Sequence, residues 1–234
     1  MTDRVRITDV APRDGLQNEP GVIPAREKAA LVDALSAAGV DEVEVSSFVS
    51  PKWVPQLGDA AEVFSLISPR EGVVYSALVP NERGLAGAME VRAASRVRHG
   101  RALPDKLAVF TAASQTFSRR NTNATIEETI ERFAPIAAAC RAEGVPLRGY
   151  ISCIVACPFE GAIEAGAVAR VARMLVDLGV DEIDLGDTIG AGTPDSIGRV
   201  IEAVMAGGVG GASKTLLTLH LHDTFGAAAL CVER

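Results

Sequence analysis

The segment Gly39-Val-Asp-Glu-Val-Glu44 indicates the fold of this chain, because it recurs almost unchanged as Gly179-Val-Asp-Glu-Ile-Asp184. Each copy places a glycine where an expected helix ends and an acidic, β-branched run directly after it, where a strand begins. The copies lie 140 residues apart, which equals four strand–helix units of about 35 residues. The offset corresponds to half of a regular fold built from eight β/α units. The alternative is that Gly-Val-Asp-Glu simply suits any junction from helix to strand.

The same alternation runs along the whole chain. Short β-branched runs predict strands at Val5–Val10, Glu42–Ser46, Val73–Val79, Leu107–Thr111, Leu147–Ser152, Glu182–Leu185 and Leu216–Leu221. Between them, helices are expected at Ala25–Ala38, Ala60–Ile67, Glu82–Ala94, Ile126–Glu143, Ala165–Leu178 and Asp195–Ala206, with a further start after Thr224. Thr125 and Glu128 form a capping box, and Pro24 suits the first turn of its helix.

Strand–helix alternation predicts a parallel sheet flanked by helices. Seven units in a row predict the α/β class and a TIM (β/α)₈ barrel, here with about seven of its eight βα units. A doubly wound open sheet is the alternative, weakened because no GxGxxG follows the first strand. We expect one barrel domain over residues 1–234, incomplete at the C-terminus, since Ala227–Arg234 has the pattern of a helix cut short.

Composition excludes several classes of protein. The chain has 234 residues, 48% hydrophobic and 23% charged, with a net charge of −7, so disordered, collagen-like and nucleic-acid-binding proteins are disfavoured. Four cysteines are too few for a disulfide scaffold, the start resembles no targeting segment, and no apolar run is long enough for a membrane span. We therefore expect a cytoplasmic protein that binds neither nucleic acid nor membrane.

Polar residues gather where the predicted strands end. In a barrel the active site lies at the carboxyl ends of the strands. In strand order, these positions hold Arg13 and Asp14, then Glu44 and Ser47, Asn81, Ser114 with Arg119, Arg120 and Asn121, Tyr150 and Ser152, Asp187 and Thr188, and finally His220 and His222. Packing alone does not explain so many polar side chains at one end of apolar strands.

His220-Leu221-His222 predicts a metal clamp. Residues i and i+2 of a strand point to the same face, so two imidazoles project together and need a carboxylate to complete the set. Asp14 is the natural candidate, and two histidines with one aspartate suit several divalent metals without choosing among them. The alternative is a pair of hydrogen-bonded histidines at the barrel rim. Asp223 is expected to cap the next helix or to orient a histidine.

The other polar residues have competing interpretations. Arg13 beside Asp14 suits either a surface ion pair or an oxyanion stabiliser next to a metal ligand. Glu44 suits a solvated rim charge and Asp187 a turn residue. Arg119 and Arg120 suit contacts with the phosphates of a nucleotide-bearing substrate. The remaining histidine and two of the cysteines are not expected to be site residues. We expect His99 to lie in a solvated basic loop, and Cys153 and Cys157 to be thiols that bind no zinc.

Longer phrases resemble the hydroxymethylglutaryl-CoA lyase family. They are Ala11-Pro-Arg-Asp-Gly-Leu-Gln-Asn-Glu19, Ser47-Phe-Val-Ser-Pro-Lys-Trp-Val-Pro-Gln56, Leu185-Gly-Asp-Thr-Ile-Gly-Ala-Gly-Thr-Pro194 and His220-Leu-His-Asp-Thr-Phe-Gly226, with support from Gly149-Tyr-Ile-Ser-Cys153 and Cys157-Pro-Phe-Glu-Gly161. The resemblance extends from about Val5 to Phe225. It implies a TIM-barrel metallolyase.

The resemblance implies an activity and roles for the residues. The family cleaves 3-hydroxy-3-methylglutaryl-CoA to acetyl-CoA and acetoacetate, a step of leucine degradation, with Mg²⁺ or Mn²⁺. The expected partners are this acyl-CoA and a second copy of the chain in a homodimer. The implied roles are metal binding for Asp14, His220 and His222; catalysis for Arg13, Glu44, Asp187 and His220; and substrate binding for Arg13, Gln17, Ser47, Tyr150 and Thr188, to which the residue pattern adds Arg119, Arg120 and Asn121.

The chain also differs from the family that it resembles. The family places a glycine-rich loop with a catalytic cysteine, and then a metal-binding asparagine, beyond the point where this chain ends, and neither Cys153 nor Cys231 matches that cysteine. Two alternatives to a lyase therefore stay open: a Claisen-condensing synthase of the isopropylmalate or homocitrate synthase type, and an inactive fragment that still binds metal or acyl-CoA.

Overall fold

A computed structural model describes residues 4–210 and 214–233 of the chain. The chain divides into two compact units, Met1–Ala108 and Val109–Arg234, which we describe in turn as the first and second unit. No described helix is both long and apolar enough to cross a membrane.

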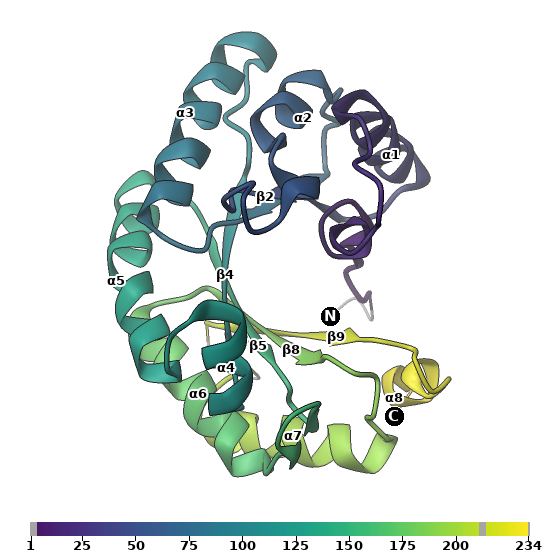
Figure 1. Ribbon diagram of the computed structural model, residues 1–234, viewed down its shortest axis with the longest axis vertical. Helices are drawn as coiled ribbons and strands as arrows, with labels where there is room; N and C mark the ends of the chain where they lie inside the picture. Colours follow the sequence, from purple (N-terminus) through teal and green to yellow (C-terminus); the bar gives the residue numbers. More distant parts are fainter. Residues whose placement is uncertain (1–3, 211–213, 234) are drawn as a thin grey trace. The chain divides into compact units, whose positions relative to one another are not determined.

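The first unit alternates strands and helices. Its elements are β1 (Thr8–Asp9), the π-helix η1 (Ala11–Gly15), α1 (Ala25–Ala38), β2 (Glu42–Ser47), the short 3-10 helix η2 (Pro55–Leu57), α2 (Ala60–Leu66), β3 (Val74–Leu78), α3 (Glu82–His99) and the start of β4 (Lys106–Ala112). β1, β2, β3 and β4 pair in parallel in that order. α1 and α2 pack against each other (Figure 1).

The second unit continues the alternation. After β4 come α4 (Gln115–Thr122), α5 (Ile126–Glu143), β5 (Leu147–Ser152), the small strands β6 (Ala156–Cys157) and β7 (Gly161–Ala162), α6 (Ala165–Leu178), β8 (Glu182–Asp187), α7 (Pro194–Ala206), β9 (Leu216–Leu221) and α8 (Ala228–Glu233). β5–β8 and β8–β9 are parallel pairs, and β6–β7 is an antiparallel hairpin. The strand order of the main sheet is β1-β2-β3-β4-β5-β8-β9.

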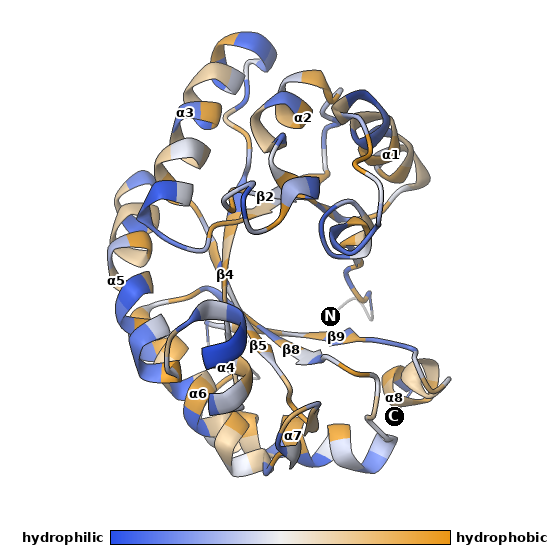
Figure 2. Ribbon diagram, viewed as in Figure 1, coloured by the Kyte–Doolittle hydropathy of each residue, from blue (hydrophilic) through white to orange (hydrophobic). Residues whose placement is uncertain are grey.

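Local chemistry explains where the helices begin and end. Asn81, Ser114 and Thr125 accept a backbone N–H in the first turn of α3, α4 and α5, and Thr193 does so for α7. Thr125 and Glu128 form the predicted capping box. β4 and β5 are almost entirely buried; Figure 2 shows them largely in pale and orange tones, whereas part of α4 is deep blue. Asn81 and Ser114 therefore cap helices.

The predicted alternation and parallel pairing are confirmed, and α1, β5, α5, α6 and β9 have the predicted bounds. Pro24 is the residue before α1 rather than part of its first turn. That the chain forms a single barrel domain stays a prediction.

Two local predictions are wrong. The strand expected at Val5–Val10 shrinks to β1, because Asp9 accepts the Ala11 amide and the Val10 carbonyl accepts that of Asp14, which starts η1. α4 and the β6–β7 hairpin lie in segments for which the sequence predicts no helix or strand. α3 extends to His99, which is therefore a residue of the last helical turn and not of a basic loop.

Candidate active site

The first unit holds a buried cation between two carboxylates. Arg13 and Asp14 lie in η1, and π-helical turns often occur at functional sites. Nε of Arg13 donates to Glu44 at 2.5 Å, and Nη1 donates to Asp14 at 2.6 Å. Arg13 is 8% exposed and Glu44 is fully buried. Losing either carboxylate would leave a buried positive charge less well compensated, so the three side chains hold one another in place.

β2 brings more polar atoms to this end of the sheet. Glu44 and Ser47 are buried, and Ser47 is the last residue of the strand. Among the described residues, none hydrogen-bonds Oε1 of Glu44 or the hydroxyl of Ser47. Gln17 lies two residues beyond the end of η1 and is half-buried. Buried polar atoms without partners are costly in a folded chain, and they mark positions where a ligand or water can bind.

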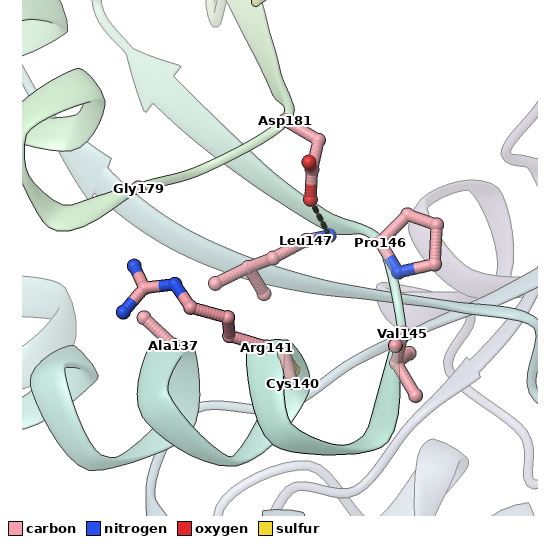
Figure 3. Close-up of a pocket in the computed structure, with 9 residues that line it drawn as sticks. Ala137, Cys140, Arg141, Val145, Pro146, Leu147, Gly179 and Asp181 are labelled. Carbon is pink, nitrogen blue, oxygen red and sulfur yellow. Dashed lines mark hydrogen bonds between the residues drawn. The ribbon is translucent and has the colours of Figure 1, made fainter.

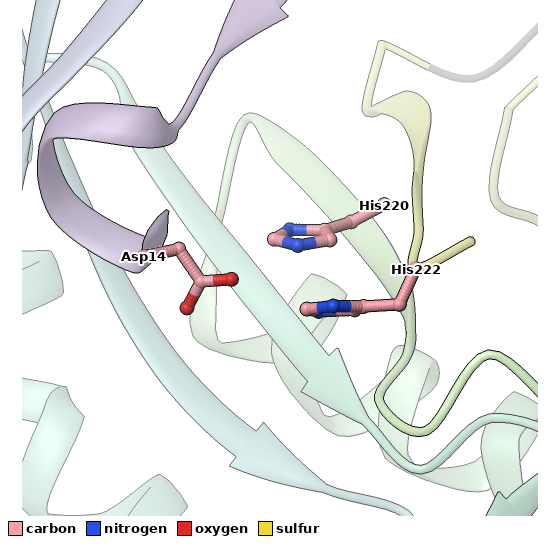
Figure 4. Close-up of side chains that lie close together, drawn as sticks. All are labelled: Asp14, His220 and His222. Carbon is pink, nitrogen blue, oxygen red and sulfur yellow. The ribbon is translucent and has the colours of Figure 1, made fainter. Parts of the chain in front are cut away.

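The second unit holds two stacked histidines. His220 lies on β9 and His222 one residue beyond its end. Their rings are 5.0 Å apart between centroids and 21° from parallel. Figure 4 draws the two stacked rings, together with Asp14 on η1. The two imidazoles thus project to the same side, as the spacing predicts. Asp223 accepts the amide of Ala228, the first residue of α8, which is the expected capping contact.

His220 has two further neighbours in the same unit. Tyr150 of β5 presents its ring edge-on to His220, with 6.2 Å between centroids. Asp184 of β8 lies 3.9 Å from Nδ1 of His220 through its Oδ1 and accepts from Thr218 at 2.7 Å through Oδ2. Burial raises the pKa of Asp184, whereas His220, Arg148 and the Thr218 hydrogen bond act in the opposite direction. The predicted site residues did not include Asp184.

Asp187 and Thr188 organise the loop after β8. The carboxylate of Asp187 accepts the amides of Ala191 at 3.2 Å and Gly192 at 2.7 Å. The Thr188 hydroxyl accepts the amide of Cys153 at 2.8 Å. Gly192 has no room for a Cβ, which would meet the Asp187 carboxylate at 2.7 Å. These contacts are those of a turn residue, one of the two roles expected for Asp187 from the sequence.

The α4 residues form a separate exposed group. Arg119, Arg120 and Asn121 are exposed. The guanidinium of Arg120 lies 4.1 Å from the ring centroid of Phe159, and the Asn121 side chain donates to the carbonyl of Phe117. The structure describes no contact between these residues and the histidines, so their link with the site rests on the expected substrate alone.

The cysteines Cys153 and Cys157 have different environments. The Ser114 hydroxyl donates to Cys157 at 3.1 Å. Burial alone would raise the pKa of Cys157, but hydrogen bonds from Ser114 and from backbone amides hold it below its usual value. Burial raises the pKa of Cys153 to about 12. Sequence patterns do not indicate this difference, because it depends on donors from α4 and from the β6–β7 segment.

A cavity of about 290 Å³ lies at the other end of β5. It is lined by α5 residues and by Val145, Leu147 and Asp181, and Asp181 accepts the Leu147 amide (Figure 3). Because it lies where β5 begins, it is remote from the carboxyl end at which the site residues of the second unit gather.

The fold and these side chains are those of an α/β enzyme with its polar residues at the carboxyl ends of parallel strands, and comparisons with known proteins name the family. The HMGL-like family model matches residues 4–230. The 3-hydroxy-3-isohexenylglutaryl-CoA/hydroxy-methylglutaryl-CoA lyase of Pseudomonas aeruginosa is 48% identical over 228 residues, covering 97% of this chain and 71% of that protein. The chain belongs to the HMGL-like family.

Solved structures agree. The HMG-CoA lyase of Brucella melitensis has a TM-score of 0.88 and 44% identity, covering 99% of this chain and 77% of that chain. An HMG-CoA lyase from Acinetobacter baumannii, in complex with coenzyme A and 3-methylmalate, has a TM-score of 0.86 and 32% identity, covering 97% and 70%. These matches confirm both the predicted TIM-barrel fold class and the resemblance to hydroxymethylglutaryl-CoA lyases.

Proposed function

We propose that this chain is a divalent-metal-dependent lyase that cleaves 3-hydroxy-3-methylglutaryl-CoA to acetyl-CoA and acetoacetate. The observation that carries the proposal is Arg13, a buried cation held by Glu44 and Asp14 at the carboxyl end of the strands. Its support is membership of the HMGL-like family and the activity for which relatives such as that of Pseudomonas aeruginosa are named.

The donor set suits a divalent metal. Asp14, His220 and His222 each offer one ligand atom, and the stacked imidazoles already project to one side. Carboxylate oxygen suits Mg²⁺ and Mn²⁺, and imidazole suits the later first-row metals, so the set fits a divalent ion and we propose Mg²⁺ or Mn²⁺. A bound divalent ion supplies Lewis acidity that lowers the pKa of a coordinated hydroxyl.

The reaction defines what the chain's own residues must do. The C3 hydroxyl loses its proton, the C2–C3 bond breaks, C3 becomes the ketone of acetoacetate, and C2 carries the electron pair as the enolate of acetyl-CoA until it gains a proton. Arg13 is placed to stabilise the negative charge that develops on the thioester oxygen. Glu44 and Asp187 are proposed as acid–base or positioning groups; the bonds of Asp187 to two backbone amides favour positioning. His220 is proposed to face the reacting hydroxyl.

The substrate needs a pocket for its acyl part and a surface for its nucleotide. Gln17, Ser47, Tyr150 and Thr188 are proposed to line the acyl pocket, with the unpartnered Ser47 hydroxyl as its clearest support. Exposed Arg119, Arg120 and Asn121 are proposed to contact the coenzyme A phosphates; the coenzyme A complex of the Acinetobacter enzyme supports a coenzyme A ester as the ligand class. A cytoplasmic homodimer that acts in leucine degradation completes the proposal.

One assay tests the proposal against its alternatives. The purified chain is incubated with 3-hydroxy-3-methylglutaryl-CoA and Mg²⁺ or Mn²⁺, and acetoacetate and acetyl-CoA are measured. We expect equal amounts of both products, and none after chelation of the metal. Release of coenzyme A thiol from acetyl-CoA that depends on a 2-oxoacid would instead indicate a Claisen synthase. Binding of metal or acyl-CoA without turnover would indicate a binding fragment.

A further inference from the structure

Asp184 is a buried carboxylate with one occupied and one open oxygen. Thr218 of the neighbouring strand donates to Oδ2 at 2.7 Å. Among the described residues, none hydrogen-bonds Oδ1, and the group that faces it is Nδ1 of His220 at 3.9 Å. Closing that gap to a hydrogen bond needs a movement of only about 1 Å. Oδ1 of Asp184 therefore needs only a small movement to accept a hydrogen bond from the imidazole of His220.

Strand register explains why these two side chains meet. In the β8–β9 pair, Thr218 is the partner of Asp184 and Gly186 is the partner of His220. Since Gly186 has no side chain, the nearest side chain on the same face of β8 is Asp184. A Cβ at Gly186 would lie 3.3 Å from the carbonyl of Ile151, tighter than ordinary van der Waals contact.

The other nearby charges have partners of their own. Arg148 donates to Glu182 at 2.6 Å and to the Tyr150 hydroxyl at 3.1 Å. Arg148 also acts on Asp184 electrostatically, as do Glu182 and His220. Of these neighbours, His220 is the one that faces Oδ1, so an ion pair with Arg148 does not account for the orientation of Asp184.

The internal repeat gives an independent reason to look at this position. Asp184 is the last residue of Gly179-Val-Asp-Glu-Ile-Asp184, and Glu44 is the last residue of the matching segment. Glu44 holds Arg13 through Oε2 while Oε1 has no described hydrogen-bond partner. Both copies of the repeat therefore end in a buried carboxylate beside a basic residue proposed to act in the reaction.

We propose that Asp184 is a positioning residue for His220: its Oδ1 accepts the Nδ1–H of the imidazole, which fixes the tautomer that leaves Nε2 to bind the divalent metal. The proposal rests on the metal site of the proposed function. Histidines that bind metals commonly donate their second N–H to a carboxylate, and loss of that partner costs about ten- to hundredfold in metal affinity. Asp184 itself does not touch metal or substrate.

The first measurement uses the unsubstituted, metal-free chain. Nitrogen-15 NMR of labelled histidine, with His220 assigned by comparison with a His220→Gln sample, reports which ring nitrogen carries the proton at neutral pH. We expect the Nδ1–H tautomer. An Nε2–H tautomer for His220 would overturn the proposal, and this result does not depend on lyase activity.

The second measurement compares two matched substitutions. Asp184→Asn offers an amide N–H to the ring, so we expect the tautomer to shift and Mn²⁺ affinity, measured by calorimetry without substrate, to fall about ten- to hundredfold. Asp177→Asn, which changes an exposed carboxylate on α6, should leave both unchanged. Equal Mn²⁺ affinity in folded Asp184→Asn and the unsubstituted chain would refute the positioning role.

The lyase assay separates this proposal from the proposed function. The chain can lack lyase activity while His220 is the Nδ1–H tautomer and Mn²⁺ binding depends on Asp184. That combination would refute the proposed lyase function and support the positioning role. Restoration of Mn²⁺ affinity by Asp184→Glu, relative to Asp184→Asn, would add support, because only a carboxylate can accept the Nδ1–H and carry the charge.

Discussion

Strands β2 and β8 begin with the same acidic phrase, yet their carboxylates have different tasks at successive positions. The first acidic residues, Asp41 and Asp181, each accept a backbone amide at 2.9 Å. The second, Glu42 and Glu182, each hold a buried cation at 2.6 Å, Lys106 and Arg148 respectively.

The third positions differ between the two strands. Glu44 contacts Arg13 at 2.5 Å, whereas Asp184 stands 3.9 Å from His220. The repeat thus preserves structural contacts where the strands begin and provides different basic partners where they approach the site.

The largest expected effect is on stability, at the second acidic position. Glu42→Gln and Glu182→Gln each remove the carboxylate charge from a buried ion pair, which costs about 3–5 kcal/mol. Urea unfolding followed by circular dichroism should show similar losses for both variants. A large loss in one and none in the other would break the equivalence of the two strands.

At the third position of β2, the expected effect is on the reaction. Arg13→Gln should lower kcat by about 10²–10³ and change KM little, because a stabiliser of the developing oxyanion acts in the transition state. Steady-state kinetics with 3-hydroxy-3-methylglutaryl-CoA checks this. A normal kcat with a raised KM would reassign Arg13 to substrate anchoring.

The corresponding test in the second unit concerns the metal. His222→Ala should weaken Mn²⁺ binding by well over tenfold, about 1.4 kcal/mol or more, since one of three protein ligands is lost. Calorimetry measures the affinity, and His99→Ala, which changes a histidine at the end of α3, is the control. Unchanged Mn²⁺ affinity in His222→Ala would contradict the predicted metal clamp of His220 and His222.

The smallest expected effect is a pH dependence confined to the second unit. The pKa of Cys153 is raised to about 12 from an ordinary value of 9.0, so the folded chain keeps its proton where the unfolded chain has lost it. This contribution to stability is complete below about pH 9 and is lost as the pH rises towards 12. Cys153→Ala should flatten the fall in unfolding free energy between pH 9 and pH 11, with pH 7 as the reference. An equally steep fall in the variant would contradict the burial of this thiol.

Much of the fold could be predicted, because helix and strand periodicities are local. The bounds of α1 and α6, the glycines that end them and the same-side projection of His220 and His222 all follow from neighbouring residues. The π-helix η1 and the helix α4 could not be predicted, because they depend on how loops fold back after a strand.

The site shows the same limit. Arg13, Asp14 and Glu44 are recognisable in the sequence as charged residues near strand ends, but not as a buried cluster. The sequence does not mark Asp184 as a site residue, because it is one of several acidic residues in the repeated segment. A search for the partner of each repeated acidic residue would have found it.

The sequence by itself determined the alternation of strands and helices, the parallel sheet and the family, because these depend on patterns along the chain. Only the tertiary structure decided which charge each carboxylate meets: Lys106 for Glu42, Arg13 for Glu44, Arg148 for Glu182 and His220 for Asp184. The physical reason is that these partners come from other strands or from η1. Strand register and the direction of the side chains across the sheet, rather than spacing in the sequence, determine which of them meet.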